Sequence, residues 1–211
     1  MKKEIMTDKP TVHKIIQVAT PLFAQKGFAG VSVKEIAEAA SVNIALISYH
    51  FGGKENLYAT ILEAQFELVD KIIHVVRKEE NSSVEKIRRF SQEFVKLNKS
   101  YPEIHRLIYG EIINSSTCYQ NIVKPGVIRS HDFIAECIRA GIKSGEFRPD
   151  IKPDCANILL ASVLNFYFFT NQLADIFLAE KNDKAAYYMA EAIDIYLKGI
   201  LKDSIVAEIK E

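Results

Sequence analysis

The sequence has little that would mark a secreted or metal-bound protein. It contains three cysteines, Cys118, Cys137 and Cys155. Their odd number and the lack of CxxC spacing argue against a disulfide framework and against a zinc site. Metal-ligand spacing is also absent among three of the five histidines, His13, His74 and His131. We therefore expect a protein of a reducing, cytoplasmic compartment that holds no metal and no cofactor.

An excess of charge and a membrane-length apolar run are absent as well. The chain has 27 basic and 27 acidic residues, so its formal net charge is zero, which argues against a surface coated in basic charge. The longest apolar run, residues 158–169, has 12 residues, whereas a membrane-spanning helix needs about 20. The two lysines at the start are not followed by an apolar stretch, so we expect no secretory signal. A hydrophobic content of 48% over 211 residues is ample for a folded core.

The stretch from Ser32 to Leu57 carries the clearest local pattern in the chain. Apolar residues recur there with the spacing of one helix face, at Val33, Ile36, Ala37 and Ala40. Ser32 and Glu35 match a capping box, in which a hydroxyl and a carboxylate each satisfy a backbone N–H at the helix start. Asn43 is a favoured N-cap for a second helix. The spacing predicts two short helices joined by a tight turn, with a third helix directly after them.

The second of these helices has two different sides. At about 100° per residue, three apolar residues fall together and are expected to pack on the first helix: Ile44, Ile47 and Phe51. We assign Ile44 to the core, with a position at the helix start that would also let it lean toward a base. The opposite arc is short of acidic groups and rich in small, aromatic and apolar-tipped side chains, which suit base edges and thymine methyl groups. Lys54, in the first turn of the next helix, suits a phosphate. We predict as DNA-binding residues Ser32, Asn43, Ala45, Leu46, Ser48, Tyr49, His50 and Lys54.

The segment SVKEIAEAASVNIALISYHFGGKENLY resembles the DNA-binding helix-turn-helix of the TetR family of ligand-responsive transcriptional regulators. The resemblance is carried by EIAEAA, the aromatic pair before Phe51 and the following Lys-Glu-x-Leu, and it covers about the first quarter of the chain closely. Ser41 departs from the glycine usual in the family's turn, so either the turn is looser or a cost of about 1 kcal/mol is accepted for a positive φ. The resemblance implies a homodimer on a palindromic operator, released by a small-molecule effector.

Helical spacing of apolar residues predicts an all-α protein of about nine helices. Besides the two short helices described above, we expect helices at residues 11–26, 54–77, 83–99, 102–113, 125–143, 153–179 and 184–201. We expect residues 1–53 to form the helix-turn-helix domain and residues 54–211 to form an effector-binding and dimerisation domain. The long helix after residue 54 would connect the two.

The apolar run at residues 158–169 predicts the dimer contact. A helix that is apolar all the way round must be buried, and one small domain covers only one of its sides. A second copy of the same helix is the natural cover for the other side. With the last helix of each subunit, this predicts a four-helix bundle about a two-fold axis.

Aromatic residues with a few polar groups make a plausible effector pocket in the second domain. The predicted ligand-binding residues are Phe94, His105, Tyr109, Phe133, Cys137, Asn165, Phe166 and Phe169. Aromatic stripes at helical spacing are usually core, so a packing role stays open for each of them. His105 and Glu111 are six residues apart, which puts them on different helix faces and gives little support to catalysis.

These observations favour a homodimeric, helix-turn-helix transcriptional regulator, a repressor of a palindromic operator, and not an enzyme. Its partners would be double-stranded DNA, a small, partly apolar effector and a second copy of the chain bound through the last two helices. We expect no membrane association. The alternative is a helical module that binds a small molecule or a protein without binding DNA. An enzyme built on the same bundle is the second rival.

Overall fold

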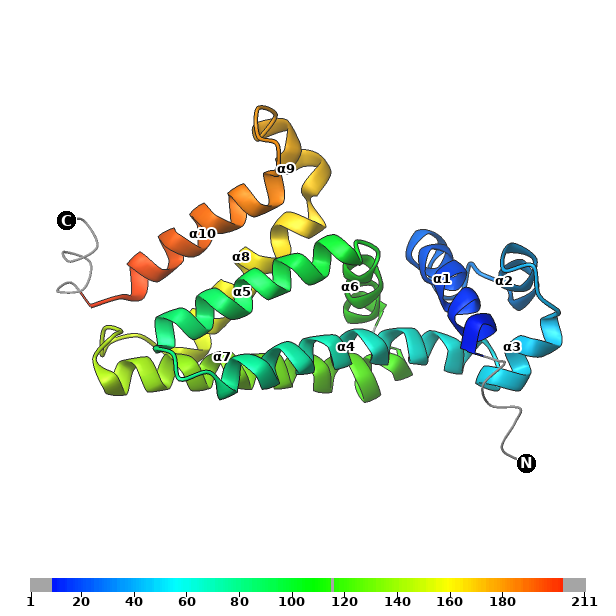
Figure 1. Ribbon diagram of the computed structural model, residues 1–211, viewed down its shortest axis with the longest axis horizontal. Coiled ribbons are helices and arrows are strands. Elements are labelled where there is room, and N and C mark those ends of the chain that lie inside the picture. Colours follow the sequence, from blue (N-terminus) through cyan, green and yellow to red (C-terminus); the bar gives the residue numbers. More distant parts are fainter. Residues whose placement is uncertain (1–8, 115, 203–211) are drawn as a thin grey trace. The chain divides into compact units, whose positions relative to one another are not determined.

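The computed structural model describes residues 9–114 and 116–202 (Figure 1). Within them the chain forms ten α-helices, one π-helical turn and one isolated antiparallel bridge between Phe147 and Leu201. The elements are α1 (Lys9–Lys26), α2 (Val33–Ala39), α3 (Ile44–Phe51), α4 (Lys54–Lys78), α5 (Ser83–Ser100), α6 (Ile104–Asn114), η1 (Tyr119–Val123), α7 (Lys124–Ser144), α8 (Pro153–Phe169), α9 (Asn171–Phe177) and α10 (Lys184–Ile200). The predicted all-α class is confirmed. The two lysines near the start, used above to argue against a secretory signal, lie outside the described residues.

One helix predicted from the sequence is two helices in the structure. Thr170 separates α8 from α9, so the single helix predicted for residues 153–179 is wrong. The Thr170 hydroxyl donates a hydrogen bond to the Phe166 carbonyl oxygen at 2.8 Å, and its backbone N–H donates to the same oxygen at 2.9 Å. A threonine hydroxyl that competes for a helix carbonyl bends or loosens the helix at that turn.

The described chain divides into two compact units. The first unit contains residues 9–67 and 103–125, and the second contains residues 68–102 and 126–202. The division falls inside α4, and α6 and η1 belong to the first unit. The boundary predicted at residue 53 separates two functions, which the packing of the chain does not test, so it stays a prediction.

The first unit has its own apolar core. Side chains of α1, α2, α3 and the first half of α4 fill it, and the largest that are fully buried are Phe23, Ile15, Ile36, Ile47, Leu57, Ile61 and Leu62. The rings of Phe23 and Tyr58 meet edge to face with their centroids 5.0 Å apart. α6 packs on α1 and adds Leu107 to the same core. This packing fixes the two short helices of the helix-turn-helix.

The second unit is built around α5, α7, α8 and α10. Phe90 of α5 and Phe133 of α7 lie with ring centroids 5.6 Å apart, and α8 packs on both α5 and α10. The buried side of α8 carries Leu160, Leu164 and Tyr167. Its other side is also apolar but open to solvent, with 62% of Ile158 and 61% of Phe166 exposed. None of the helices in the described part of the chain is long and apolar enough to cross a membrane.

Candidate nucleic-acid interface

The start of α2 is held by its N-cap residue. Ser32 is in an extended conformation, and its hydroxyl accepts a hydrogen bond from the Glu35 backbone N–H at 3.1 Å. The Glu35 carboxylate in turn accepts a hydrogen bond from Lys26 Nζ of α1 at 2.5 Å. The pKa of Glu35 is lowered mainly because of this hydrogen bond, with a smaller contribution from the Ser32 backbone N–H. The contact with Lys26 ties α2 to α1, and no local pattern in the sequence indicates it.

The turn between α2 and α3 contains a strained residue. Ser41 adopts a φ of 51° and is the one non-glycine residue of the described chain with a positive φ. Its backbone N–H donates to the Glu38 carbonyl oxygen at 3.0 Å, and the N–H of Val42 donates to Ala37 O at the same distance. Of the two possibilities left open from the sequence, the turn is therefore tight and Ser41 takes the left-handed conformation.

The inner side of α3 packs on the core through Ile47 and Phe51 but not through Ile44. Asn43 caps the helix, because its side-chain oxygen accepts from the Ala45 backbone N–H at 2.8 Å. Ile47 is completely buried and Phe51 packs on the same core. Ile44, which we predicted to be in the core, is 49% exposed, so that prediction is wrong. Ile44 occupies the first helical position, and Val42 from the preceding turn packs against the core instead.

The outer side of α3 presents three of the predicted DNA-binding residues to solvent. Ala45, Ser48 and Tyr49 are exposed, and the Tyr49 side chain is 73% exposed. His50 is half-buried and its ring meets the Tyr49 ring edge to face, with centroids 4.9 Å apart. Leu46 is half-buried as well. The outer side therefore offers a methyl group, a hydroxyl and a phenol from one short helix, as the sequence predicted.

Two glycines let α4 begin immediately after α3. Gly52 is the C-cap of α3 with a φ of 76°, and Gly53 has a φ of 135°. Both values are readily adopted by glycine and rarely by other residues. The short turn places the first residue of α4 beside the connection between α1 and α2.

The ammonium group of Lys54, which we predicted to contact a DNA phosphate, makes contacts within the protein. Its Nζ donates to the backbone oxygens of Phe28 at 3.0 Å and Val31 at 2.9 Å, and lies 4.2 Å from the centroid of the Phe28 ring. Lys54 therefore holds the start of α4 to the α1–α2 connection. A phosphate contact of the same ammonium group remains a prediction.

A buried polar cluster joins α4 to α6 within the first unit. Glu111 is 4% exposed and accepts hydrogen bonds from the Tyr58 hydroxyl at 3.0 Å and from the Ser116 hydroxyl. Burial and the neighbouring Glu111 carboxylate raise the pKa of Tyr58 well above its ordinary range. These contacts give Glu111 a structural role. The sequence had indicated it only beside His105, whose ring stacks on Tyr109 with centroids 6.2 Å apart.

The residues predicted to bind an effector are divided between the two units. His105 and Tyr109 belong to the first unit, and the other six belong to the second. Phe133 and Cys137 are buried in the core of the second unit, with Phe94 packed against them. Phe166 and Phe169 are exposed on α8, and Asn165 donates to the Ala161 carbonyl oxygen at 2.7 Å. Among the described residues, no group of histidine, cysteine and acidic side chains is arranged to hold a metal ion.

Comparisons with known proteins agree with this geometry. Residues 15–61, which span α1 to the first turns of α4, match the profile described as bacterial regulatory proteins, tetR family. The chain is 26% identical over 200 residues to the probable HTH-type transcriptional regulator YttP of Bacillus subtilis, covering 93% of this chain and 97% of that protein. It is 29% identical over 111 residues to the biofilm operon icaADBC HTH-type negative transcriptional regulator IcaR of Staphylococcus aureus, covering 47% of this chain and 60% of IcaR.

A solved structure extends the likeness to the whole fold. The crystal structure of HlyIIR, a hemolysin II transcriptional regulator, superposes with a TM-score of 0.72 at 25% identity and covers 92% of this chain and 99% of that one. All three of these relatives are described as transcriptional regulators. Residues 15–61 thus carry a helix-turn-helix of the tetR family, and the chain as a whole resembles TetR-family transcriptional regulators in sequence and in its all-helical fold.

Proposed function

We propose that this chain is a homodimeric repressor that reads a palindromic operator with the outer side of α3 and leaves it when a small effector binds. The observation that carries the proposal is the exposure of Tyr49, at 73%, on a helix whose Ile47 is completely buried. A large aromatic side chain held in solvent by a rigid, capped helix is available to a partner. Repression is supported by the relative IcaR, which is described as a negative regulator.

The chemistry of the outer side suits a duplex. In the major groove, Ala45 can contact a thymine methyl group, and Ser48 can donate to or accept from a base edge. Tyr49 can donate its hydroxyl to a phosphate oxygen, which positions α3 without reading sequence. Ile44 joins this surface because it is exposed at the start of α3 and can pack on a second methyl group. The remaining predicted DNA contacts stay proposals, at Ser32, Asn43, Leu46, His50 and Lys54.

The open side of α8 supports a two-fold dimer. Ile158, Leu159, Phe166 and Phe169 of α8 are each more than half exposed, and Ile195 of α10 is 70% exposed. An exposed apolar surface of this kind, here on α8 and α10, is typical of an interface between two copies of a chain. We call these five residues the α8–α10 face. A dimer formed there gives the two recognition helices that a palindromic operator requires, about 34 Å apart or somewhat more.

Effector binding in the second unit would shift the dimer toward a state that no longer fits the operator. The effector must bind that state more tightly than the DNA-bound state, because a ligand with equal affinity for both shifts nothing. Since a regulator acts where the chromosome is, we also propose a cytoplasmic location.

To test the proposal, the purified full-length protein is used to select fragments of genomic DNA. The binding of the protein to these fragments is then measured. Tyr49→Ala should weaken operator binding by about tenfold, the size of one lost polar or stacking contact of about 1.4 kcal/mol. Tyr101→Ala is the matched control, because Tyr101 is 45% exposed and lies in the second unit. Fluorescence anisotropy at several salt concentrations measures both variants. Failure of the wild type to bind any duplex in a salt-dependent way would leave the alternative, a helical binding module without DNA.

The dimer has its own test. Phe166→Glu should convert the dimer to a monomer in light scattering after size exclusion, because it places a charge in the α8–α10 face. Val75→Glu, at a 53% exposed site on α4, should leave the dimer intact. A wild-type monomer at micromolar concentration, or a dimer that tolerates Phe166→Glu, would contradict the proposed face.

A further inference from the structure

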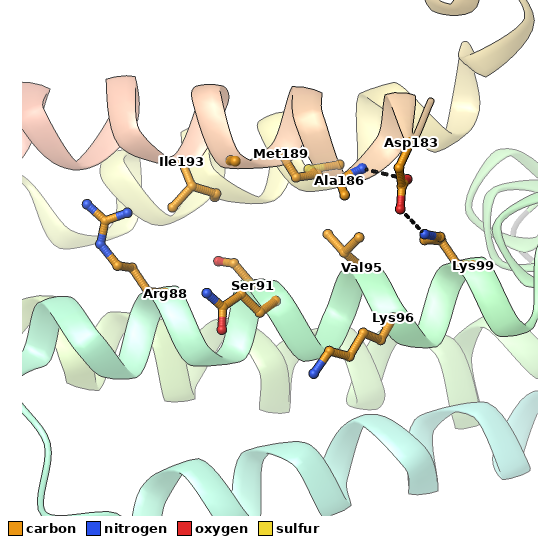
Figure 2. Close-up of a pocket in the computed structure, with 11 residues that line it drawn as sticks. Arg88, Ser91, Val95, Lys96, Lys99, Asp183, Ala186, Met189 and Ile193 are labelled. Carbon is orange, nitrogen blue, oxygen red and sulfur yellow. Dashed lines mark hydrogen bonds and ion pairs between the residues drawn. The ribbon is translucent and has the colours of Figure 1, made fainter. Parts of the chain in front are cut away.

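The second unit contains a groove between α5 and α10 that none of the predicted site residues lines. Its volume is about 460 Å³, within the range of small-molecule sites. Figure 2 shows side chains of the two helices facing each other across it, with Arg88 toward one end and Lys99 at the other.

The groove exists because α10 has small residues where it faces α5. Ala186 and Ala190 are one helical turn apart and lie on the same side of α10. Val95, Met189 and Ile193 are buried and make an apolar floor. The middle of the groove is therefore suited to an apolar body and offers it little hydrogen bonding.

The two ends of the groove differ in charge. At one end Lys99 Nζ pairs with Asp183 at 2.5 Å, and the other oxygen of that carboxylate accepts from the Ala186 backbone N–H at 3.1 Å (Figure 2). This end is neutral. At the other end Arg88 pairs with Asp194 at 3.3 Å, while Lys198 holds the second oxygen of Asp194 at 2.6 Å. These three side chains comprise two cations and one carboxylate, so together they carry a charge of +1.

Arg88 is the group most able to accept an anion. Its guanidinium carries five N–H donors in a planar fork that matches a carboxylate, and one of its nitrogens donates to Asp194. Lys96 also lines the groove, but Figure 2 shows its tip turned away from α10, and it pairs with Glu93 at 2.8 Å. The positive charge inside the groove is therefore concentrated at Arg88.

We propose that this groove binds a small monoanion with an apolar body, of the class of medium-chain carboxylates. The carboxylate binds at Arg88, and the apolar chain lies over Val95 and Met189 toward the Lys99–Asp183 pair. From Arg88 to Lys99 the helix rises about 16 Å, at 1.5 Å per residue, so the site favours an elongated ligand. This inference rests on the proposed function, because it names the class of the effector and the place where it binds.

The position of the groove connects it to the proposed dimer. Ile195 of the α8–α10 face is about 140° to 180° around α10 from Ala190 and Ala186. One side of α10 thus lines the groove and the opposite side belongs to the proposed interface. A ligand that sets the spacing of α5 and α10 changes the position of α10, and with it the geometry of the dimer.

The experiment titrates the full-length protein with sodium decanoate in a calorimeter, and with decanol as the neutral probe of the same chain length. The wild type should bind one decanoate per chain, more tightly than decanol. Ala190→Phe fills the groove and should weaken decanoate binding at least about tenfold. Arg88→Gln should weaken decanoate at least about fivefold and leave decanol unchanged. Lys143→Gln, which removes an exposed lysine at the end of α7, is the control and should bind like the wild type.

Melting curves and light scattering check that the variants fold and dimerise, and Ala186→Leu replaces Ala190→Phe if that variant does not fold. Equal binding of decanoate and decanol, or unchanged binding after the groove is filled, would overturn the inference. Operator binding without decanoate separates the two proposals. A wild type that binds operator but not decanoate refutes the groove alone, and one that binds no operator refutes the proposed function whatever the titration shows.

Discussion

Replacing Lys54 with methionine removes an ammonium group and keeps most of the aliphatic stem. In the folded protein this group donates to the carbonyl oxygens of Phe28 and Val31 and lies over the Phe28 ring. At a half-exposed site each hydrogen bond contributes about 1 kcal/mol, and the cation–π contact about 0.5–1 kcal/mol. The expected loss in the free energy of unfolding is therefore about 2–3 kcal/mol.

Urea denaturation followed by circular dichroism measures this loss. Lys34→Met is the matched control, because Lys34 is an exposed lysine of α2 that forms a long surface ion pair with Glu38, at 3.8 Å. Such a surface pair contributes about 0.5 kcal/mol or less. A Lys54→Met variant as stable as the control would refute a structural role for the ammonium group.

The same variant decides whether Lys54 also contacts DNA. Loss of one phosphate contact should lower the slope of log K against log salt by about 1. A lower stability with an unchanged slope would leave Lys54 as a structural residue only, and the prediction from the sequence would then be wrong.

Two further experiments test the strain at Ser41 and the burial of Cys137. Ser41→Gly should raise the free energy of unfolding by about 0.5–1 kcal/mol. A left-handed non-glycine residue costs about 1–2 kcal/mol, and the extra chain entropy of glycine offsets part of the gain from relieving it. Urea denaturation measures the change, and a destabilised variant would contradict the strain at φ 51°. Cys155 is exposed, whereas burial raises the pKa of Cys137 to about 11. At pH 8 only about 0.1% of Cys137 is thiolate, so peptide mass spectrometry after thiol labelling should find Cys155 modified first and Cys137 modified only on unfolding. Early modification of Cys137 would contradict its burial.

Periodicity predicted the parts of the fold in which one local pattern decides the outcome. The helix boundaries of α2 and α3 follow from the caps Ser32 and Asn43, whose side chains accept from backbone N–H groups as predicted. In each case the interacting atoms are within four residues of one another.

The errors occur where contacts outside the helix itself decide the outcome. Ile44 fits the inner side of α3 by angle, but Val42 packs against the core there, and a helical wheel cannot include a residue of the turn. The wheel also could not show that Lys54 would meet carbonyl oxygens 23 and 26 residues earlier. An all-apolar helix such as α8 gives no angular signal, so the sequence could not separate its core side from its exposed side. The groove was missed because small alanines give no positive signal.

The boundary between the two units, inside α4, has a practical consequence for anyone who wishes to work with the DNA-reading part alone. A fragment that stopped at residue 53 would lack Leu57, Tyr58, Ile61 and Leu62, all of which are buried in the first core. A fragment that stopped at residue 67 would still lack α6 and η1, which lie in residues 103–125 of the same unit. The first unit is formed by two separate segments of the chain, so no single truncation yields it complete.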